Sequence, residues 1–205
     1  MTVVSATGSI GAEDLHAAIV RLSDVTGVRI FPSEHLNTPL GVGRADNRFA
    51  TKSSPYQVLF FAETFETAFL EALVRDRYVG VSGQKELPLK MRSLSAYAAI
   101  SVPPDVELPF LDLRDNGCHH IRVSTDTVRS SDHLPGRELG ARIYEHHQND
   151  LAGIVFRSRH DSKSVYAVFS WATGRLSASD ARGLIKDHPD LIQTMRDHRI
   201  VWRES

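Results

Sequence analysis

The feature that most constrains the fold is a strand-like block that runs directly into a helix-like block. Residues 58–62 read VLFFA, a continuous apolar run typical of a strand buried on both faces. Thr64 follows, and a threonine at this point is a common N-cap because its hydroxyl accepts a backbone N–H. The block therefore predicts a buried strand leading into an amphipathic helix. The expected buried stripe of that helix comprises Phe65, Ala68, Phe69, Ala72 and Leu73.

Glu71 lies beside this apolar stripe and not on the far solvent face of the expected helix. A carboxylate near the core needs a partner or a chemical role, because burying an uncompensated charge is costly. One interpretation is an ion pair with Arg75, which lies four residues later on the same helix face. The other interpretation is catalysis.

The remaining patterns mix strands with helices. An amphipathic helix at 12–23, ended by Gly27, precedes a short strand at 28–31 that ends at Pro32. Hairpin-like strands alternating with helices predict an α+β fold with mixed, mostly antiparallel sheets and flanking helices, not a doubly wound sheet. Further strands are expected at 94–102, 106–113, 153–157 and 165–171, and further helices at 136–148, 179–187 and 190–197.

Residues 32–56 form a long segment in which prolines, glycines and short polar residues break any sustained period. Loops of this length are uncommon inside compact domains unless they are functional or disordered. The segment carries Arg48, so it is a candidate lid over a ligand. Its GVG at 41–43 does not match a dinucleotide-binding glycine fingerprint.

Length and composition indicate one globular domain spanning 1–205. The chain has 205 residues, of which 41% are hydrophobic and 24% charged, both ordinary for globular proteins. The net charge of −1 and the lack of a dense basic tract argue against direct nucleic-acid binding. No apolar run approaches the length of a membrane span and no secretion signal is visible, so we expect a cytoplasmic protein without membrane association.

Cysteine and histidine usage gives little support for a metal or thiol site. Cys118 is the single cysteine, and it has no recognisable base at a diagnostic spacing. The adjacent histidines at 119–120 and 146–147 point in different directions on a helix or strand and do not form a chelating face. We expect no metal, and we interpret these histidines as solvated or core residues.

Three charged residues point to a reaction class. Arg29 is expected on a strand, Arg48 after a flexible loop and Glu71 on a helix. Arginines grip pyrophosphate through two oxygens at once, and a carboxylate stabilises positive charge that develops on a sugar. Together these groups suit NAD cleavage or ADP-ribosyl transfer. Either arginine could instead be a surface charge, and Arg48 could be a solvated loop residue.

The chain resembles the RES domain family over roughly residues 27–171. The matching pieces, in family order, are VRIF with Arg29, NRF with Arg48, VLFFAETFETAFLEAL with Glu71, LDL at 111–113, and AGIVFRSRH with Ser158. Outside them lie an expected N-terminal helix within 1–26 and a C-terminal helical extension at 172–205, which could cap the core or form a partner surface.

The resemblance implies a toxin of a toxin–antitoxin pair, with a cognate Xre-type antitoxin as its expected partner. It implies a fold like that of diphtheria-toxin-type ADP-ribosyltransferases. It also implies an enzyme that degrades NAD by phosphorolysis or hydrolysis, with inorganic phosphate as a possible co-substrate and no bound cofactor. The oligomeric state stays open, a homo-oligomer included.

The resemblance also implies roles for individual residues. Glu71 and Arg29 are the expected catalytic residues, while Arg48, Ser158 and Phe60 are expected to bind substrate. Family members usually carry tyrosine where this chain has Phe60, which can stack on nicotinamide but offers no hydroxyl. Ser158 could instead only satisfy a local turn.

Two other functions stay open at this stage. The first is an ADP-ribosyltransferase that modifies a protein, since only the acceptor distinguishes it from an NAD-degrading enzyme. The second is a catalytically weakened module that binds NAD, because the tyrosine hydroxyl is missing at Phe60.

Overall fold

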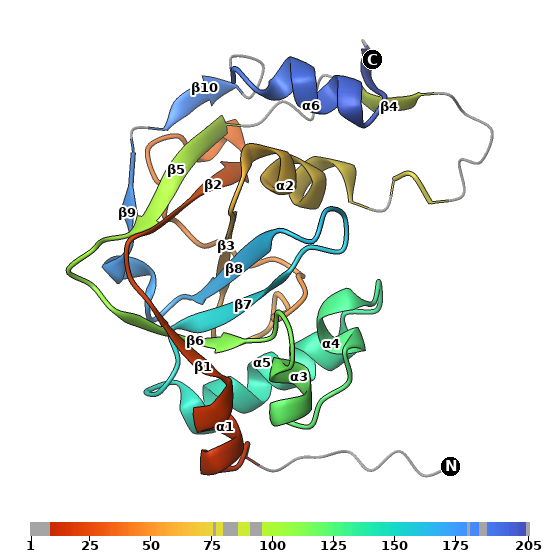
Figure 1. Cartoon of the computed structure of the whole chain (residues 1–205). Helices are drawn as coiled ribbons and strands as arrows, with labels where there is room; N and C mark the ends of the chain where they lie inside the picture. Colours follow the sequence, from red (N-terminus) through yellow and green to blue (C-terminus); the bar gives the residue numbers. More distant parts are fainter. Residues whose placement is uncertain are drawn as a thin grey trace.

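A large curled sheet organises the molecule, with helices gathered at its two ends (Figure 1). In this computed structural model the described residues are 9–75, 77–79, 86–90, 96–179, 181–184 and 188–203. Within them, nine strands join in the order β1-β6-β7-β8-β3-β2-β5-β10, with β9 paired to β5. Their bounds are β1 Ile19–Leu22, β2 Val25–Phe31, β3 Val58–Ala62, β5 Ala96–Val102, β6 Leu108–Asp112, β7 Gly153–Arg157, β8 Ser164–Phe169, β9 Ser177–Ala178 and β10 Arg182–Leu184.

The expected α+β class and mostly antiparallel pairing are confirmed. In the large sheet only β6 and β7 pair in parallel among the described strands. A separate pair, β4 (Leu87–Lys90) and β11 (Ile200–Arg203), is also parallel. The helices are α1 Ala12–Ala18, α2 Phe65–Phe69, α3 Gly117–His120, α4 Asp126–Arg129, α5 Leu134–His147 and α6 Leu191–Asp197, with short 3-10 turns at Ser33–His35 and Thr173–Arg175.

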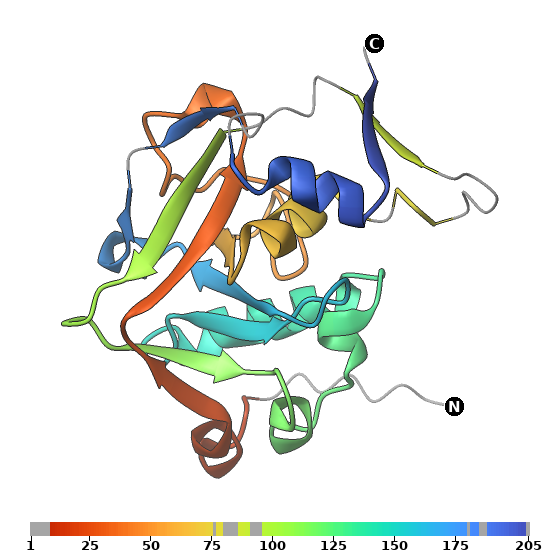
Figure 2. The same cartoon turned by 45° about the horizontal axis from the view of Figure 1, so that its top comes forward.

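The helices divide into two groups. In both views α1, α3, α4 and α5 lie at one end of the sheet, and α2 and α6 at the other (Figures 1 and 2). The strands between them are covered on both faces, so β8 is buried along its whole length. None of the helices in the described residues is both long enough and apolar enough to cross a membrane.

The strand–helix block folds as expected. β3 occupies residues 58–62, is buried apart from half-exposed Phe60, and pairs with β8 along all five residues. Thr64 caps α2, because its Oγ1 accepts the backbone N–H of Thr67 at 3.1 Å. The helix then widens into a π-helical turn, Leu70–Val74, which carries Glu71.

Two glycines let α5 approach the long 32–56 loop. A Cβ on Gly136 would lie 2.4 Å from the carbonyl oxygen of Arg48, and one on Gly140 would lie 2.1 Å from that of Phe49. Only glycine permits such contact between a helix and the backbone of a loop. α5 thereby holds the part of the loop that contains Arg48.

Two expected helices are partly wrong. The helix at 12–23 ends at Ala18, and Ile19–Leu22 form β1, which pairs with β6 from Ile19↔Leu111 to Leu22↔Leu108. Pairing with an available sheet edge outweighs the helical spacing of apolar residues here, as tertiary context often does. Gly27 does not end a helix but lies within β2.

The helix expected at 179–187 is also replaced, in its described part, by a strand. Residues 182–184 form β10, which pairs with β5, while residues 180 and 185–187 lie outside the described residues. The helix at 190–197 is confirmed as α6. The C-terminal extension thus contains strands as well as a helix.

Replacing Gly140 by alanine should destabilise the fold by about 1–3 kcal/mol, because the new methyl group would overlap the Phe49 carbonyl and the Tyr56 hydroxyl. In an unhindered helix the same change would be stabilising. Thermal or chemical unfolding measures the effect. Gly174→Ala is the matched control, since a Cβ there meets nothing within 4 Å. Equal stability of the two variants would contradict the packing of α5 on the loop.

Candidate active site

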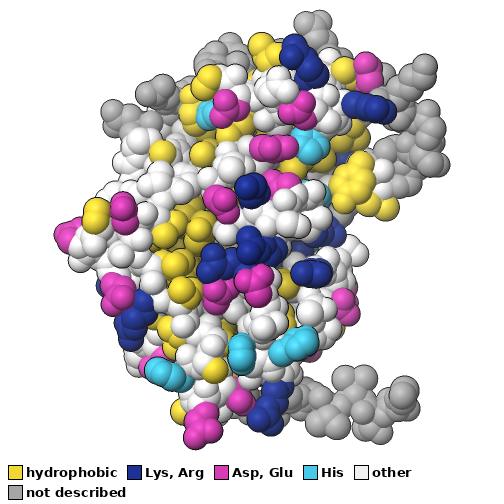
Figure 3. Space-filling view, viewed as in Figure 1, with side chains coloured by type: hydrophobic (Ala, Val, Ile, Leu, Met, Phe, Trp, Pro, Cys, Tyr) yellow, Lys and Arg dark blue, Asp and Glu magenta, His cyan; other side chains and the backbone are white. Residues whose placement is uncertain are grey.

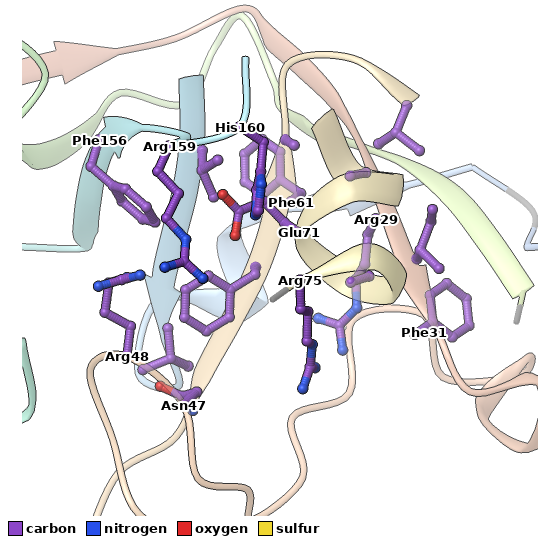
Figure 4. A pocket seen from close by; sticks show the side chains of 18 of the residues that line it. Arg29, Phe31, Asn47, Arg48, Phe61, Glu71, Arg75, Phe156, Arg159 and His160 are labelled. Carbon is purple, nitrogen blue, oxygen red and sulfur yellow. The ribbon is translucent and has the colours of Figure 1, made fainter. Parts of the chain in front are cut away.

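A cavity of about 310 Å³ opens where β2 separates from β3. The two strands pair only at Val28↔Ala62, and a Cβ on Gly27 would lie 2.3 Å from the Ala62 carbonyl oxygen, so the strands touch there and then diverge. The walls are the diverging strands, the 46–48 segment of the long loop, the turn after α2 and the loop between β7 and β8. Figure 4 shows the side chains that point into this space.

Arg29 projects from β2 into the cavity. Its Nη2 donates to the Gly41 carbonyl oxygen at 2.8 Å, whereas its Nη1 is buried and has no hydrogen-bond partner among the described residues. Burial lowers the pKa of Arg29 to about 10. The group is still charged at neutral pH, so the site holds a half-buried positive charge with an unused donor.

Surface arginines of the same molecule are arranged differently. Arg114 and Arg157 lie within 2.6 Å and 3.6 Å of the carboxylates of Asp112 and Asp115. Figure 3 shows such mixed charges over the middle of one face, where dark blue and magenta side chains are interspersed. No carboxylate in the described residues is within ion-pair distance of Arg29, so an anion from solution is the group that would complement it.

Arg48 is also a lining residue, and it is buried at 8% exposure. Its Nη1 donates to the Ser130 carbonyl oxygen at 2.9 Å, and the guanidinium lies 6.0 Å from the centre of the Phe156 ring. The interpretation of Arg48 as a solvated loop residue is therefore wrong.

Asn47 fixes the turn that carries Arg48. Its Oδ1 accepts the backbone N–H groups of Phe49 and Ala50 at 2.9 Å each. Its carbonyl oxygen accepts the Arg137 Nε at 3.0 Å, which ties the turn to α5. The long loop is thus locally ordered around NRF, and the position of Arg48 follows from that order.

Glu71 and Ser158 lie together although they are 87 residues apart. The Ser158 hydroxyl donates to Glu71 Oε1 at 2.7 Å, and Ser158 is buried at 2% exposure. The ion pair between Glu71 and Arg75 is not formed among the described residues, and Arg75 has left the helical conformation, with φ 48° and ψ −129°. The serine also satisfies its own turn by accepting the His160 N–H at 3.2 Å.

A second contact holds the serine loop, residues 158–163 between β7 and β8, against α2. The buried hydroxyl of Thr67 donates to Asp161 Oδ2 at 2.7 Å, and Asp161 Oδ1 accepts the Lys163 N–H at 3.1 Å. Thr67 and Glu71 are one turn apart on the same helix. Two hydrogen bonds, Ser158 to Glu71 and Thr67 to Asp161, therefore join the helix to the loop, and they fix the orientation of the Glu71 carboxylate.

Phe60 lines the cavity with its half-buried ring. The ring stacks on Phe49 with centroids 6.3 Å apart and planes inclined by 14°. The apolar wall formed in this way, together with Phe156, can receive a flat ring.

Other lining residues were not predicted as site residues from the sequence. Arg159 and His160 directly follow Ser158, so their presence at the cavity was foreseeable once the serine was placed. Phe156 lies in the same AGIVFRSRH motif, two residues before Ser158, whereas His133 lies outside all the motifs and carries no sequence signal of its own. The added lining residues with polar or aromatic side chains are Phe31, Asp46, Asn47, Phe61, Arg75, His133, Phe156, Arg159 and His160.

The described residues contain no group of three His, Cys, Asp or Glu side chains placed to hold a metal ion. Burial raises the pKa of Cys118, which disfavours a reactive thiolate. His147 is a core residue, since it is buried and its Nε2 accepts the Ile10 N–H at 3.2 Å.

Comparison with known proteins gives one family match. The family described as RES domain matches residues 26–192, which is most of the chain. All five residues that we expected in the site fall within this range.

Two similar proteins are informative. The sequence is 26% identical over 124 residues, 60% of this chain and 95% of the relative, to a protein named "Probable toxin y4kH" from Sinorhizobium fredii (strain NBRC 101917 / NGR234). The fold is similar to a chain in the crystal structure of the M. tuberculosis MbcT-MbcA toxin-antitoxin complex, with a TM-score of 0.64, 15% identity, and coverage of 90% of this chain and 95% of that chain.

Replacing Thr67 by valine should free the serine loop from α2. The variant keeps the shape of the side chain but loses the hydrogen bond to Asp161, at a cost of about 1 kcal/mol. Amide exchange at Ser162, whose N–H donates to the Ser158 carbonyl oxygen, should accelerate. Thr67→Ser retains the hydroxyl and is the control. Unchanged exchange in Thr67→Val would show that the contact does not hold the loop.

Replacing Arg29 by methionine should raise the stability of the ligand-free protein. At neutral pH both the folded and unfolded states carry the charge, since the folded pKa of about 10 is still high, so the cost of burial is fully present. A buried unsatisfied donor costs about 1–3 kcal/mol. The melting temperature should rise, and its further increase on adding inorganic pyrophosphate should disappear.

The matched control is Arg21→Met, which alters an exposed arginine that lies beside Glu107, on the edge strand β1, and does not line the cavity. Its melting temperature and its response to pyrophosphate should stay close to those of the unaltered protein. A destabilised Arg29→Met variant would mean that the guanidinium is a structural group.

Proposed function

This chain belongs to the RES domain family, and on that premise we propose that it is a toxin of a toxin–antitoxin pair that cleaves the bond between nicotinamide and ribose in NAD. The observation that carries the proposal is the hydrogen bond from buried Ser158 to Glu71, because Glu71 lines the cavity together with Arg29 and Arg48. This arrangement supplies an oriented carboxylate beside two groups suited to phosphates.

The cavity has suitable size and lining for a dinucleotide fragment. Its volume of about 310 Å³ lies at the lower end of the usual range for small-molecule sites. The aromatic wall of Phe60 suits the flat nicotinamide ring. The guanidinium of Arg29, with its unused donor, suits a pyrophosphate oxygen.

Glu71 would act through electrostatics. When the nicotinamide–ribose bond breaks, its electron pair leaves with the nicotinamide nitrogen, and positive charge develops on the ribose C1 and ring oxygen. A carboxylate near that carbon gains attraction as the charge develops, so it stabilises the transition state more than the ground state. The Ser158 hydroxyl would keep the carboxylate in the required orientation, or bind the ribose.

The acceptor then completes the reaction. Water would give ADP-ribose and release a proton, and inorganic phosphate would give ADP-ribose 1″-phosphate. Transfer to a protein side chain would use the same bond cleavage, and it is distinguished by the product. We expect a small-molecule acceptor, with inorganic phosphate as co-substrate or water in its place.

An antitoxin is the expected protein partner. The similar fold from M. tuberculosis was solved in a toxin–antitoxin complex. In this chain, exposed apolar side chains stand near the cavity: Tyr78 packs on the lining residue His160, with ring centroids 5.9 Å apart, and Leu134 follows the lining residue His133. A partner that covered these groups would close the cavity.

Glu71→Gln should lower the rate of NAD cleavage by about 10²–10³-fold while NAD binding persists, because the amide keeps the shape but loses the charge. Purified protein is incubated with NAD, with and without phosphate, and the products are identified by mass spectrometry. Phosphate-dependent ADP-ribose phosphate indicates a phosphorylase, and ADP-ribose a glycohydrolase.

Glu66→Gln is the matched control, since Glu66 lies on the same helix but contacts His198, 2.6 Å away, and does not line the cavity. It should retain cleavage. Undiminished cleavage by Glu71→Gln would remove the proposed role of the carboxylate. Labelled ADP-ribose on protein would redirect the proposal to a transferase, and NAD bound without cleavage would indicate a binding module.

A further inference from the structure

Arg75 occupies an unusual backbone conformation at the end of the helix that carries Glu71. Its φ and ψ are 48° and −129°, a region that L-residues with a Cβ rarely adopt. The conformation is held because the Arg75 N–H donates to the Leu70 carbonyl oxygen at 2.7 Å, which closes the π turn. Such strain persists where the surrounding structure imposes it and is often found at functional sites.

The side chain that this backbone projects is exposed and lines the cavity. It makes no hydrogen bond and no ion pair with any described residue. Glycine would adopt the backbone conformation without strain, so the turn itself does not require an arginine. The arginine side chain is therefore best explained by what it meets in the cavity.

The carboxylates of the cavity do not neutralise Arg75. Glu71 Oε1 accepts the Ser158 hydroxyl, and Asp46 Oδ1 accepts the Lys52 N–H at 3.1 Å. Neither forms an ion pair with Arg75 in the described part of the chain. Arg29, on the facing strand, contributes a second positive charge and a buried Nη1 without a partner.

Figure 4 shows Arg75 and Arg29 reaching from two walls toward one part of the cavity, with Arg48 and Arg159 on the other side of the view. Two guanidinium groups that point toward the same space repel each other unless an anion lies between them. Each offers a fork of donors that matches phosphate oxygens.

We propose that Arg75 and Arg29 together form a phosphate-binding subsite of the cavity, with one guanidinium from the end of the helix that carries Glu71 and the other from β2. The ligand is a phosphate group, supplied either by the diphosphate of a nucleotide or by inorganic phosphate. The inference rests on the proposed function for the identity of the nucleotide, but the subsite can be tested by binding alone.

The test uses Arg75→Gly in the full chain. Glycine relieves the strained backbone, so the melting temperature should be unchanged or higher, while the dissociation constant should rise about tenfold or more. Isothermal calorimetry with ADP and, separately, with inorganic phosphate measures this loss. Arg75→Lys keeps the positive charge but loses the forked donors of the guanidinium. Its dissociation constant should lie between those of the unaltered protein and of Arg75→Gly.

The two probes distinguish the sources of the phosphate. If Arg75→Gly binds ADP more weakly but phosphate as before, the subsite holds the nucleotide diphosphate. If it binds phosphate more weakly but ADP as before, the subsite holds inorganic phosphate. In cleavage assays the corresponding KM should rise more than kcat falls. Arg77→Ala is the control, because Arg77 donates to the Leu73 carbonyl oxygen and does not line the cavity.

Binding of both probes by Arg75→Gly with the affinity of the unaltered protein would overturn the subsite, as would a loss of stability that accounts for weaker binding. These outcomes are independent of NAD cleavage. If the unaltered protein does not cleave NAD but Arg75→Gly binds ADP more weakly than it does, the proposed reaction is refuted and the subsite is supported.

Discussion

The divergence of β2 from β3 is the constraint on which the site depends. The two strands meet only at Val28↔Ala62, where Gly27 allows the close backbone approach, and beyond this point they leave the cavity between them. β2 finds its continuous partner in β5 and β3 finds its own in β8, so the sheet stays intact on either side of the split. A sheet paired along the whole β2–β3 edge would have filled this space with backbone hydrogen bonds.

The chemistry of the cavity is then set by elements that converge on the split from distant parts of the chain. The helix after β3 brings Glu71, and the loop between β7 and β8 brings Ser158. The bond between Thr67 and Asp161 joins the same helix and loop one turn away. This double attachment gives the carboxylate a defined orientation without an arginine partner in the described part of the chain.

Local patterns in the sequence correctly predicted the elements that a few neighbouring residues are enough to specify. The strand at 58–62, the cap at Thr64 and the strand at 153–157 agree with the structure. The segment 19–22 was misread as helix, because its apolar spacing suits a helix face as well as a strand that pairs with β6. The segment 182–184 was also wrongly predicted as helix. Its partner strand β5 lies more than 80 residues earlier in the chain, so no local pattern indicates the pairing.

The sequence by itself determined which chemical groups are available, in what order they occur and which short segments carry them, because periodicity, caps and turn residues act over a few neighbouring positions. Together with the family resemblance, these local patterns predicted Arg29, Arg48, Phe60, Glu71 and Ser158 as site residues, and the first four of them line the cavity. Only the tertiary structure decided that Glu71 bonds to Ser158 instead of pairing with Arg75, that Arg48 is buried and that a cavity lies between β2 and β3. These facts depend on long-range strand pairing and on the close packing of α5, and no local pattern specifies them.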